Sequence, residues 1–115
     1  MEELIARVAA AAGIEADVAR QAVAAIFNFL QTEGPQEQVA AAIAKVPGAQ
    51  DLANSAEGSG FGGLMGLATQ LMGLGLGMTE LQAAGKEIFG FMREKAGEDT
   101  IRDIADGIPG LSQFI

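Results

Sequence analysis

Carboxylates are the commonest side chains of this sequence that could do chemistry, and three of them recur at helical spacing. Asp99, Asp103 and Asp106 stand at i, i+4 and i+7, so a helix would place them on one face. Hard cations such as Ca²⁺ take oxygen ligands of this kind. The spacing is not that of a calcium-binding loop, however, and Arg102 can pair with Glu98 and Asp106 at i±4. We therefore predict a solvated acidic face and no metal site.

General acid–base and nucleophilic catalysis have few other candidates. The chain contains no His, Cys, Tyr or Trp, so it has no imidazole base, no reactive thiol and no ordinary zinc ligands. Two further pairs of carboxylates, Glu33 with Glu37 and Glu87 with Glu94, have the spacing of exposed helix residues rather than of a substrate cleft. We expect no catalytic residues and no cofactor, and we predict that the protein is not an enzyme.

One glycine-rich string matches the pattern G-x-G-x-x-G of dinucleotide-binding proteins. It spans residues 58–63, but the dinucleotide motif follows a strand, and residues 50–57 are polar and not strand-like. The chain also lacks the G-K-[ST] sequence of a P-loop. We interpret the string as a flexible linker.

The charge balance argues against two classes of partner. The chain has 15 acidic and 7 basic residues, a net charge of −8, so nucleic-acid phosphates and anionic lipid headgroups would repel it. Without Tyr or Trp it also lacks most of the aromatic side chains on which unpaired bases stack. We expect no nucleic-acid partner and no binding to anionic membrane surfaces.

The elements that would position these side chains are all helical. Apolar residues recur with a period near 3.6, and no segment alternates with period two. The expected helices span residues 2–12, 16–33, 36–46, 64–72, 80–96 and 99–106. Gly13, Gly34 and Gly97 stand where helices should end, and Thr79 with Gln82 predicts the cap of the helix at 80. We predict one all-α domain over residues 1–115, a compact bundle of five or six helices.

The two halves of the sequence resemble each other. The Pro-Gly pairs that begin at Pro47 and Pro109 are 62 residues apart, and at the same offset residues 26–30 (IFNFL) align with residues 88–92 (IFGFM). We predict that residues 13–48 and 77–110 are two related helical hairpins that bury their apolar faces on each other. Residues 57–78 form the glycine-rich apolar connection between them.

Small residues dominate the composition, with 22 Ala and 16 Gly among 115 residues. Two of the glycines, Gly85 and Gly90, lie inside a predicted helix, where Gly costs about 1 kcal/mol relative to Ala. We expect both to permit a close helix crossing, since a side chain would hold the two backbones apart.

The stretch from Ser59 to Thr79 contains no charged residue and is long enough to raise the question of a membrane span. Thr69 and Gln70 in its middle, its glycines and the lack of flanking basic residues argue against one. We predict instead a buried helix or a contact surface. The candidate interaction or apolar-pocket residues are Phe61, Leu64, Met65, Leu67, Leu71 and Met72, with Phe29 and Phe91.

Three functions fit these residues. The first is a non-catalytic interaction module that self-associates, a dimer being favoured, or binds an unknown protein partner. The second is a binder of a small apolar ligand or lipid between the hairpins, with the phenylalanines and methionines lining the cavity. The third and weakest is membrane association through residues 61–78.

A long helix that ends before EGPQEQVAAAIAKVPG, and another that ends before KAGEDTIRDIADGIPGLSQFI, give the chain a familiar pattern. It resembles small bacterial all-helical domains of unknown function, of the DUF 2267 and DUF 2780 kinds. The resemblance implies an all-helical bacterial protein and no catalytic residues. The first 15 residues carry Glu2 and Glu3 and lack the pattern of a signal peptide, so we expect a cytoplasmic protein.

Overall fold

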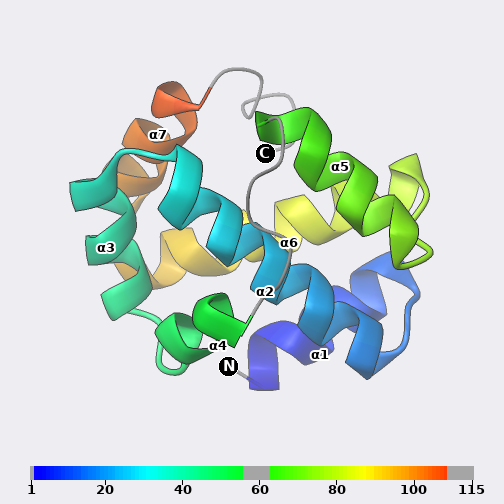
Figure 1. Cartoon of the computed structure of the whole chain (residues 1–115). Coiled ribbons are helices and arrows are strands. Elements are labelled where there is room, and N and C mark those ends of the chain that lie inside the picture. The colour runs from blue at the N-terminus through cyan, green and yellow to red at the C-terminus, as the bar shows by residue number, and fades with distance from the viewer. Residues whose placement is uncertain (1, 56–62, 109–115) are drawn as a thin grey trace.

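Glycine and proline divide the chain into short segments, and almost every segment is a helix. The computed structural model describes residues 2–55 and 63–108, and no strand occurs among them, which confirms the all-α prediction. The helices are α1 (Glu2–Ala12), α2 (Ala16–Glu33), α3 (Gln36–Ala44), α4 (Ala49–Ser55), α5 (Gly63–Gly73), α6 (Met78–Ala96) and α7 (Glu98–Gly107) (Figure 1).

The described residues thus form seven helices, and the predicted number of five or six is wrong. The additional helix is α4. α3 ends at Ala44 with Lys45 as its cap, two residues before the predicted end, and after Pro47 and Gly48 the chain turns back into a helix at Ala49. Ala49, Leu52 and Ala53 are buried at i, i+3 and i+4, which is the spacing of one helix face.

Helix ends follow the glycines in most places. Gly13 and Gly97 have φ angles of 68° and 96°, a region that residues with a side chain rarely adopt, and both end a helix as predicted. The N-terminal cap of α6 is Gly77 and not the predicted Thr79 with Gln82. The helix begins two residues earlier, at Met78, and the carboxylate of Glu80 accepts a hydrogen bond from the backbone N–H of Gly77 at 2.8 Å. A Glu at the third helical position therefore determines the cap.

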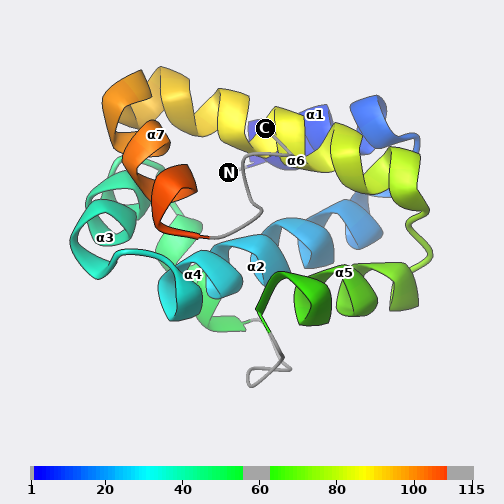
Figure 2. The ribbon, with the colours of Figure 1, turned by 90° about the horizontal axis from the view of Figure 1, so that it is seen from above.

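The two longest helices, α2 and α6, cross each other in the middle of the molecule (Figures 1 and 2). At one end α3 packs on α7. The first helix of the chain, α1, packs on α6 and also on α2, whereas α5 packs on α2. Each long helix is therefore covered by a short helix from the other half of the sequence.

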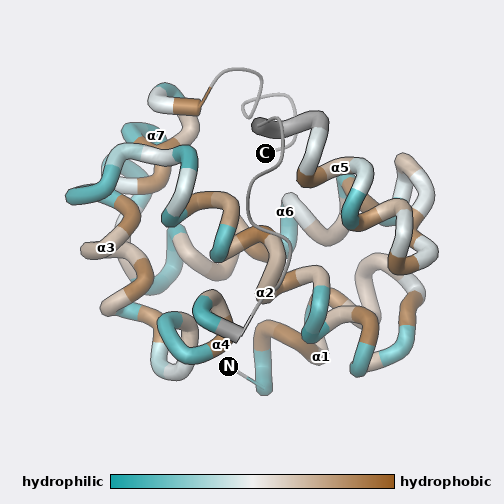
Figure 3. Tube along the Cα trace, in the orientation of Figure 1, coloured by the Kyte–Doolittle hydropathy of each residue, from teal (hydrophilic) through white to brown (hydrophobic). Residues whose placement is uncertain are grey.

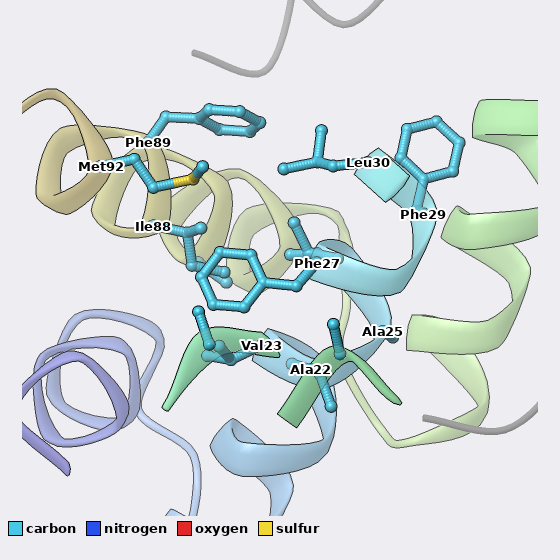
Figure 4. Close-up of a cluster of buried hydrophobic side chains, with 14 of the residues drawn as sticks. Ala22, Val23, Ala25, Phe27, Phe29, Leu30, Ile88, Phe89 and Met92 are labelled. Carbon is cyan, nitrogen blue, oxygen red and sulfur yellow. The ribbon is translucent and has the colours of Figure 1, made fainter. Parts of the chain in front are cut away.

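The core lies between α2 and α6. Figure 4 shows Val23, Phe27 and Leu30 of α2 opposite Ile88, Phe89 and Met92 of α6. The side chains of Phe27, Leu30, Ile88 and Met92 are completely buried. Within the described residues no polar or charged residue is buried, so hydrophobic burial is the main force that holds these helices together.

The close crossing predicted for Gly90 is wrong. A Cβ atom added at Gly90 would have no atom within 4 Å, because this side of α6 is partly open to solvent. Gly85 is buried within α6, and its role in a close crossing stays a prediction.

Candidate interaction surface

The helix α5 contains most of the predicted interaction residues, and its two sides differ. Leu67 and Leu71 are buried, with exposed fractions of 5% and 3%, on a helix that packs against α2. Met72 is 49% exposed. Phe61 lies outside the described residues, as do the side chains of Leu64 and Met65. Leu67 and Leu71 are thus part of the core, and Met72 is part of the surface.

The two phenylalanines of the predicted set are both in the core, each 3% exposed. Phe29 points from α2 toward α5 (Figure 4). Phe91 of α6 lies beneath α1, where the guanidinium of Arg7 and the ammonium of Lys95 are each 5.4 Å from its ring centroid. Neither ring is a surface contact, and each one packs beneath a helix from the other half.

The guanidinium of Arg7, which lies over the ring of Phe91, also forms ion pairs. Nη1 of Arg7 donates a hydrogen bond to Oε2 of Glu94 at 2.8 Å, and Nη2 lies 3.7 Å from Glu3. The carboxylate of Glu94, with smaller contributions from Glu3 and Glu87, raises the pKa of Arg7 above its usual value. A second pair, Arg20 with Glu2 at 2.8 Å, connects α2 to the start of α1. Charge thus assists apolar packing in holding α1.

The charge-free stretch contains a surface that sequence periodicity did not identify. Met72 and Met78 are 49% and 54% exposed, and they are the large hydrophobic residues that the described part of the chain leaves exposed. Between and beside them Gly73, Gly75 and Gly77 are exposed too, as is Thr79. We call these six residues the Met72–Met78 surface. The sequence signal for it was the two methionines on either side of a glycine-rich turn.

The backbone beneath this surface is held by hydrogen bonds. The N–H groups of Leu74 and Leu76 donate to the carbonyl of Leu71 at 3.0 and 3.3 Å, and that of Gly75 donates to Met72 at 2.9 Å. Leu76 is 2% exposed and fixes the middle of the turn in the core. Figure 3 shows this turn in white and brown, whereas α3 and α7 include long hydrophilic segments. The surface is therefore an ordered corner whose six residues carry no charge, with the carboxylate of Glu80 against Gly77 at its edge.

Arg102 on α7 forms one of its two predicted ion pairs, the one with Glu98. Its Nη2 lies 3.5 Å from Glu98, and its Nη1 lies 3.9 Å from Asp99. The predicted pair with Asp106 is not among the ion pairs of the described residues. No group of three acidic side chains in these residues is placed to hold a metal ion.

Three further predictions concern the glycine-rich string, a cavity for an apolar ligand and a membrane span. The glycine-rich string of residues 58–63 lies outside them, except for Gly63 at the start of α5. An open groove of about 220 Å³ is lined by Gln31, Gln36, Val39, Ala40 and Gln50, a mainly polar set that includes no phenylalanine or methionine. Among the described helices none is long and apolar enough to cross a membrane. A cavity for an apolar ligand stays a prediction.

No family model, no curated protein and no solved structure matches this chain. The resemblance to bacterial domains of unknown function therefore stays a prediction. The arrangement of the helices and the Met72–Met78 surface are the observations from which a function can be argued.

Proposed function

We propose that the protein is a non-catalytic interaction module that associates with a second copy of itself through the Met72–Met78 surface. The observation that supports the proposal is that Met72 and Met78 are both exposed, at the two ends of a hydrogen-bonded turn whose own residues carry no charge. Methionine side chains adapt to the apolar surface that they meet, which suits a contact between proteins.

Charge favours a second copy at this place. With a net charge of −8, two copies repel each other over most of their surfaces. The stretch from Ser59 to Thr79 contributes no charge, so in a contact made there the carboxylate of Glu80, which lies against Gly77, is the acidic group next to the surface. An interface of this kind gains its free energy from apolar burial rather than from ion pairs.

We further propose that the two halves are related by duplication, and that the repeat comprises three helices rather than the two predicted. α1, α2 and α3 have nearly the lengths of α5, α6 and α7 and follow one another in the same order, about 62 residues apart. Buried residues recur at this offset, in the pairs Ala22 and Ala84, Phe27 and Phe89, Phe29 and Phe91, Leu30 and Met92, and Val39 and Ile101. The crosswise packing of α1 on α6 and of α5 on α2 supports an internal pseudo-twofold relation.

The test of self-association is the molar mass in solution. Light scattering coupled to size exclusion, over a range of concentrations up to tens of micromolar, should give a dimer for the natural sequence. The double substitution Met72→Glu with Met78→Glu should shift it to the monomer, because hot-spot residues typically contribute more than about 1 kcal/mol each.

A matched control separates the interface from net charge. The double substitution Ala10→Glu with Ala41→Glu adds the same two charges at exposed helix positions on α1 and α3 and should leave most of the dimer in place. A natural sequence that is monomeric at every concentration would refute self-association. Flotation with neutral liposomes, tested on the same samples, would identify a lipid surface as the partner instead.

A further inference from the structure

Methionine is the side chain of this sequence that oxidants attack most readily. Peroxides oxidise the sulfur atoms of cysteine and methionine, and the chain contains five methionines and no cysteine. Tryptophan, tyrosine and histidine are absent as well, so no other easily oxidised side chain competes. A peroxide that reaches this protein therefore reacts at methionine sulfur.

The methionines that the structure describes differ in their access to solvent. Met72 and Met78 are 49% and 54% exposed, whereas Met92 is completely buried. Met1 and the side chain of Met65 lie outside the described residues. A close-packed interior keeps a dissolved oxidant away from Met92. The reaction is thereby directed to the Met72–Met78 surface, and it spares the core between α2 and α6.

The turn beneath the two methionines leaves them open and does not depend on their side chains. A Cβ atom added at Gly73 or Gly75 would meet nothing within 4 Å, so these neighbours do not shield the sulfur atoms. The backbone of the turn is held by the carbonyls of Leu71 and Met72 and by the buried side chain of Leu76. Oxidation would therefore change the chemistry of the surface and leave its backbone in place.

The reaction with hydrogen peroxide converts an apolar side chain into a polar one. The sulfur lone pair attacks the peroxide, one S–O bond forms, the O–O bond breaks, and water leaves. The sulfur loses two electrons to the peroxide, and the product is methionine sulfoxide. Of the six residues of the surface, Thr79 is the one whose side chain could donate a hydrogen bond to the new oxygen. Burial of a sulfoxide in a contact made there is unfavourable, because it loses its hydrogen bonds to water.

We propose that Met72 and Met78 are an oxidation site that controls the self-association of this protein. The inference rests on the proposed function, since the same two side chains are the ones that a second copy would cover. Peroxide attacks the monomer, in which both sulfur atoms are exposed. Oxidised monomers no longer pair, so the dimer is lost by mass action. The change is reversible, because methionine sulfoxide reductases restore the thioether.

The first experiment locates the oxidation. The natural sequence is treated with hydrogen peroxide at neutral pH, below the Kd of the dimer, and is digested at intervals. Trypsin cuts after Lys45, Lys86 and Arg93, so Met92 falls into a different peptide from the two exposed methionines, which fragmentation in the mass spectrometer separates. Met72 and Met78 should react about tenfold faster than Met92 or more, because access governs the rate. Equal rates would overturn the site.

The second experiment measures the dimer before and after oxidation, by light scattering coupled to size exclusion. Oxidation should raise the Kd by about tenfold or more, since each buried sulfoxide loses hydrogen bonds to water, and a sulfoxide reductase should restore it. Oxidised protein with an unchanged Kd would overturn the control by oxidation and leave self-association intact. A natural sequence that is monomeric at every concentration would refute both.

Two variants separate the surface from the other methionines. The double substitution Met72→Leu with Met78→Leu keeps apolar side chains of similar volume but removes the sulfur atoms, so the ratio of its Kd after and before peroxide should be near one. Met92→Leu removes the buried sulfur and should respond to peroxide as the natural sequence does. An equal response in the double variant, or a loss of helical circular dichroism together with the dimer, would overturn the proposal.

Discussion

The backbone of Gly107 lies against the ring of Pro35, so closely that no side chain fits between them. A Cβ atom added at Gly107 would lie 2.7 Å from Cδ and 3.0 Å from Cγ of the proline. This contact joins the end of α7 to the start of α3. At the neighbouring position, a Cβ at Gly34 would lie 2.8 Å from Val39 and 3.3 Å from Ile108. The two halves of the chain thus approach closely where the turn between α2 and α3 meets the end of α7.

We predict that Gly107→Ala destabilises the protein. The proline ring is rigid and cannot move away from the added methyl group, so the cost should be about 1–3 kcal/mol, as for other overpacked sites. Gly90→Ala is the matched control, because no atom lies within 4 Å of its Cβ position, and it should stabilise by up to about 1 kcal/mol. Urea unfolding followed by circular dichroism measures both, and equal stabilities would contradict the contact.

The glycines of this chain indicate how far sequence could predict the fold. Gly13 and Gly97 were predicted correctly as helix ends, because a left-handed residue at a helix end is a local requirement. Whether a glycine inside a helix marks a close crossing depends on what lies opposite it. Gly90 faces open space and Gly107 faces Pro35, and neither neighbourhood is encoded within a few residues of the glycine.

The helix α4 was missed for a similar reason. Its seven residues are too short for a clear period, and its polar residues favoured a loop. The sequence of α2 did contain a signal for a helix such as α4. Ala24 and Ala25 are both buried, although only part of the helix surface can face α6. A helix that is apolar around most of its surface needs cover on more than one side.

The candidate surface was predicted in part. Leu71 and Met72 were placed on one apolar face, but the first is buried and the second is about half exposed. Consecutive residues differ by about 100° around a helix, and α5 is covered on the side of α2. Which of two apolar neighbours is exposed therefore depends on the position of α2, which the sequence of α5 alone does not contain.

The attachment of α4 to α2 should depend on Asn28. Its Nδ2 donates a hydrogen bond to the carbonyl of Ala53 at 3.2 Å. Asn28→Asp has the same shape but removes the donor and places a carboxylate against a carbonyl oxygen, so it should cost about 1–3 kcal/mol at pH 7. Asn54→Asp is the control, because Asn54 is exposed and accepts a hydrogen bond from Gln50, as a carboxylate also would.

The loss of stability caused by Asn28→Asp should depend on pH. A carboxylate at position 28 has a raised pKa in the folded state, because only its protonated form can donate to the carbonyl. A raised folded pKa means that the protonated form is favoured by folding, so the loss of stability should be largest at neutral pH. It should shrink as the pH falls toward about 4, the ordinary pKa of Asp. A loss of stability that is independent of pH would contradict the hydrogen bond.

The ion pair between Arg7 and Glu94 should contribute to the packing of α1 on α6. We predict that Arg7→Gln and Glu94→Gln, made singly and together, are not additive, because each single change already removes the same interaction. The coupling should decrease in 1 M NaCl, where the Debye length is only about 3 Å. The pKa of Arg7 is raised, so this arginine stays charged at any pH near neutrality. Additive effects on the free energy of unfolding would show that the pair is not coupled.

Self-association should become stronger as salt is added at pH 7. Two copies with a net charge of −8 each repel each other, and salt shortens the range of that repulsion from about 30 Å at 0.01 M to about 10 Å at 0.1 M. The six residues of the Met72–Met78 surface carry no charge, and the Glu80 carboxylate at its edge adds to the repulsion that salt screens, so the Kd of the dimer should fall several-fold over this range. Sedimentation equilibrium in NaCl measures it, and NaCl is preferable to sulfate, which strengthens apolar burial by itself. A Kd that rises with salt would mean that ion pairs dominate the interface, and it would place that interface on another face of the molecule.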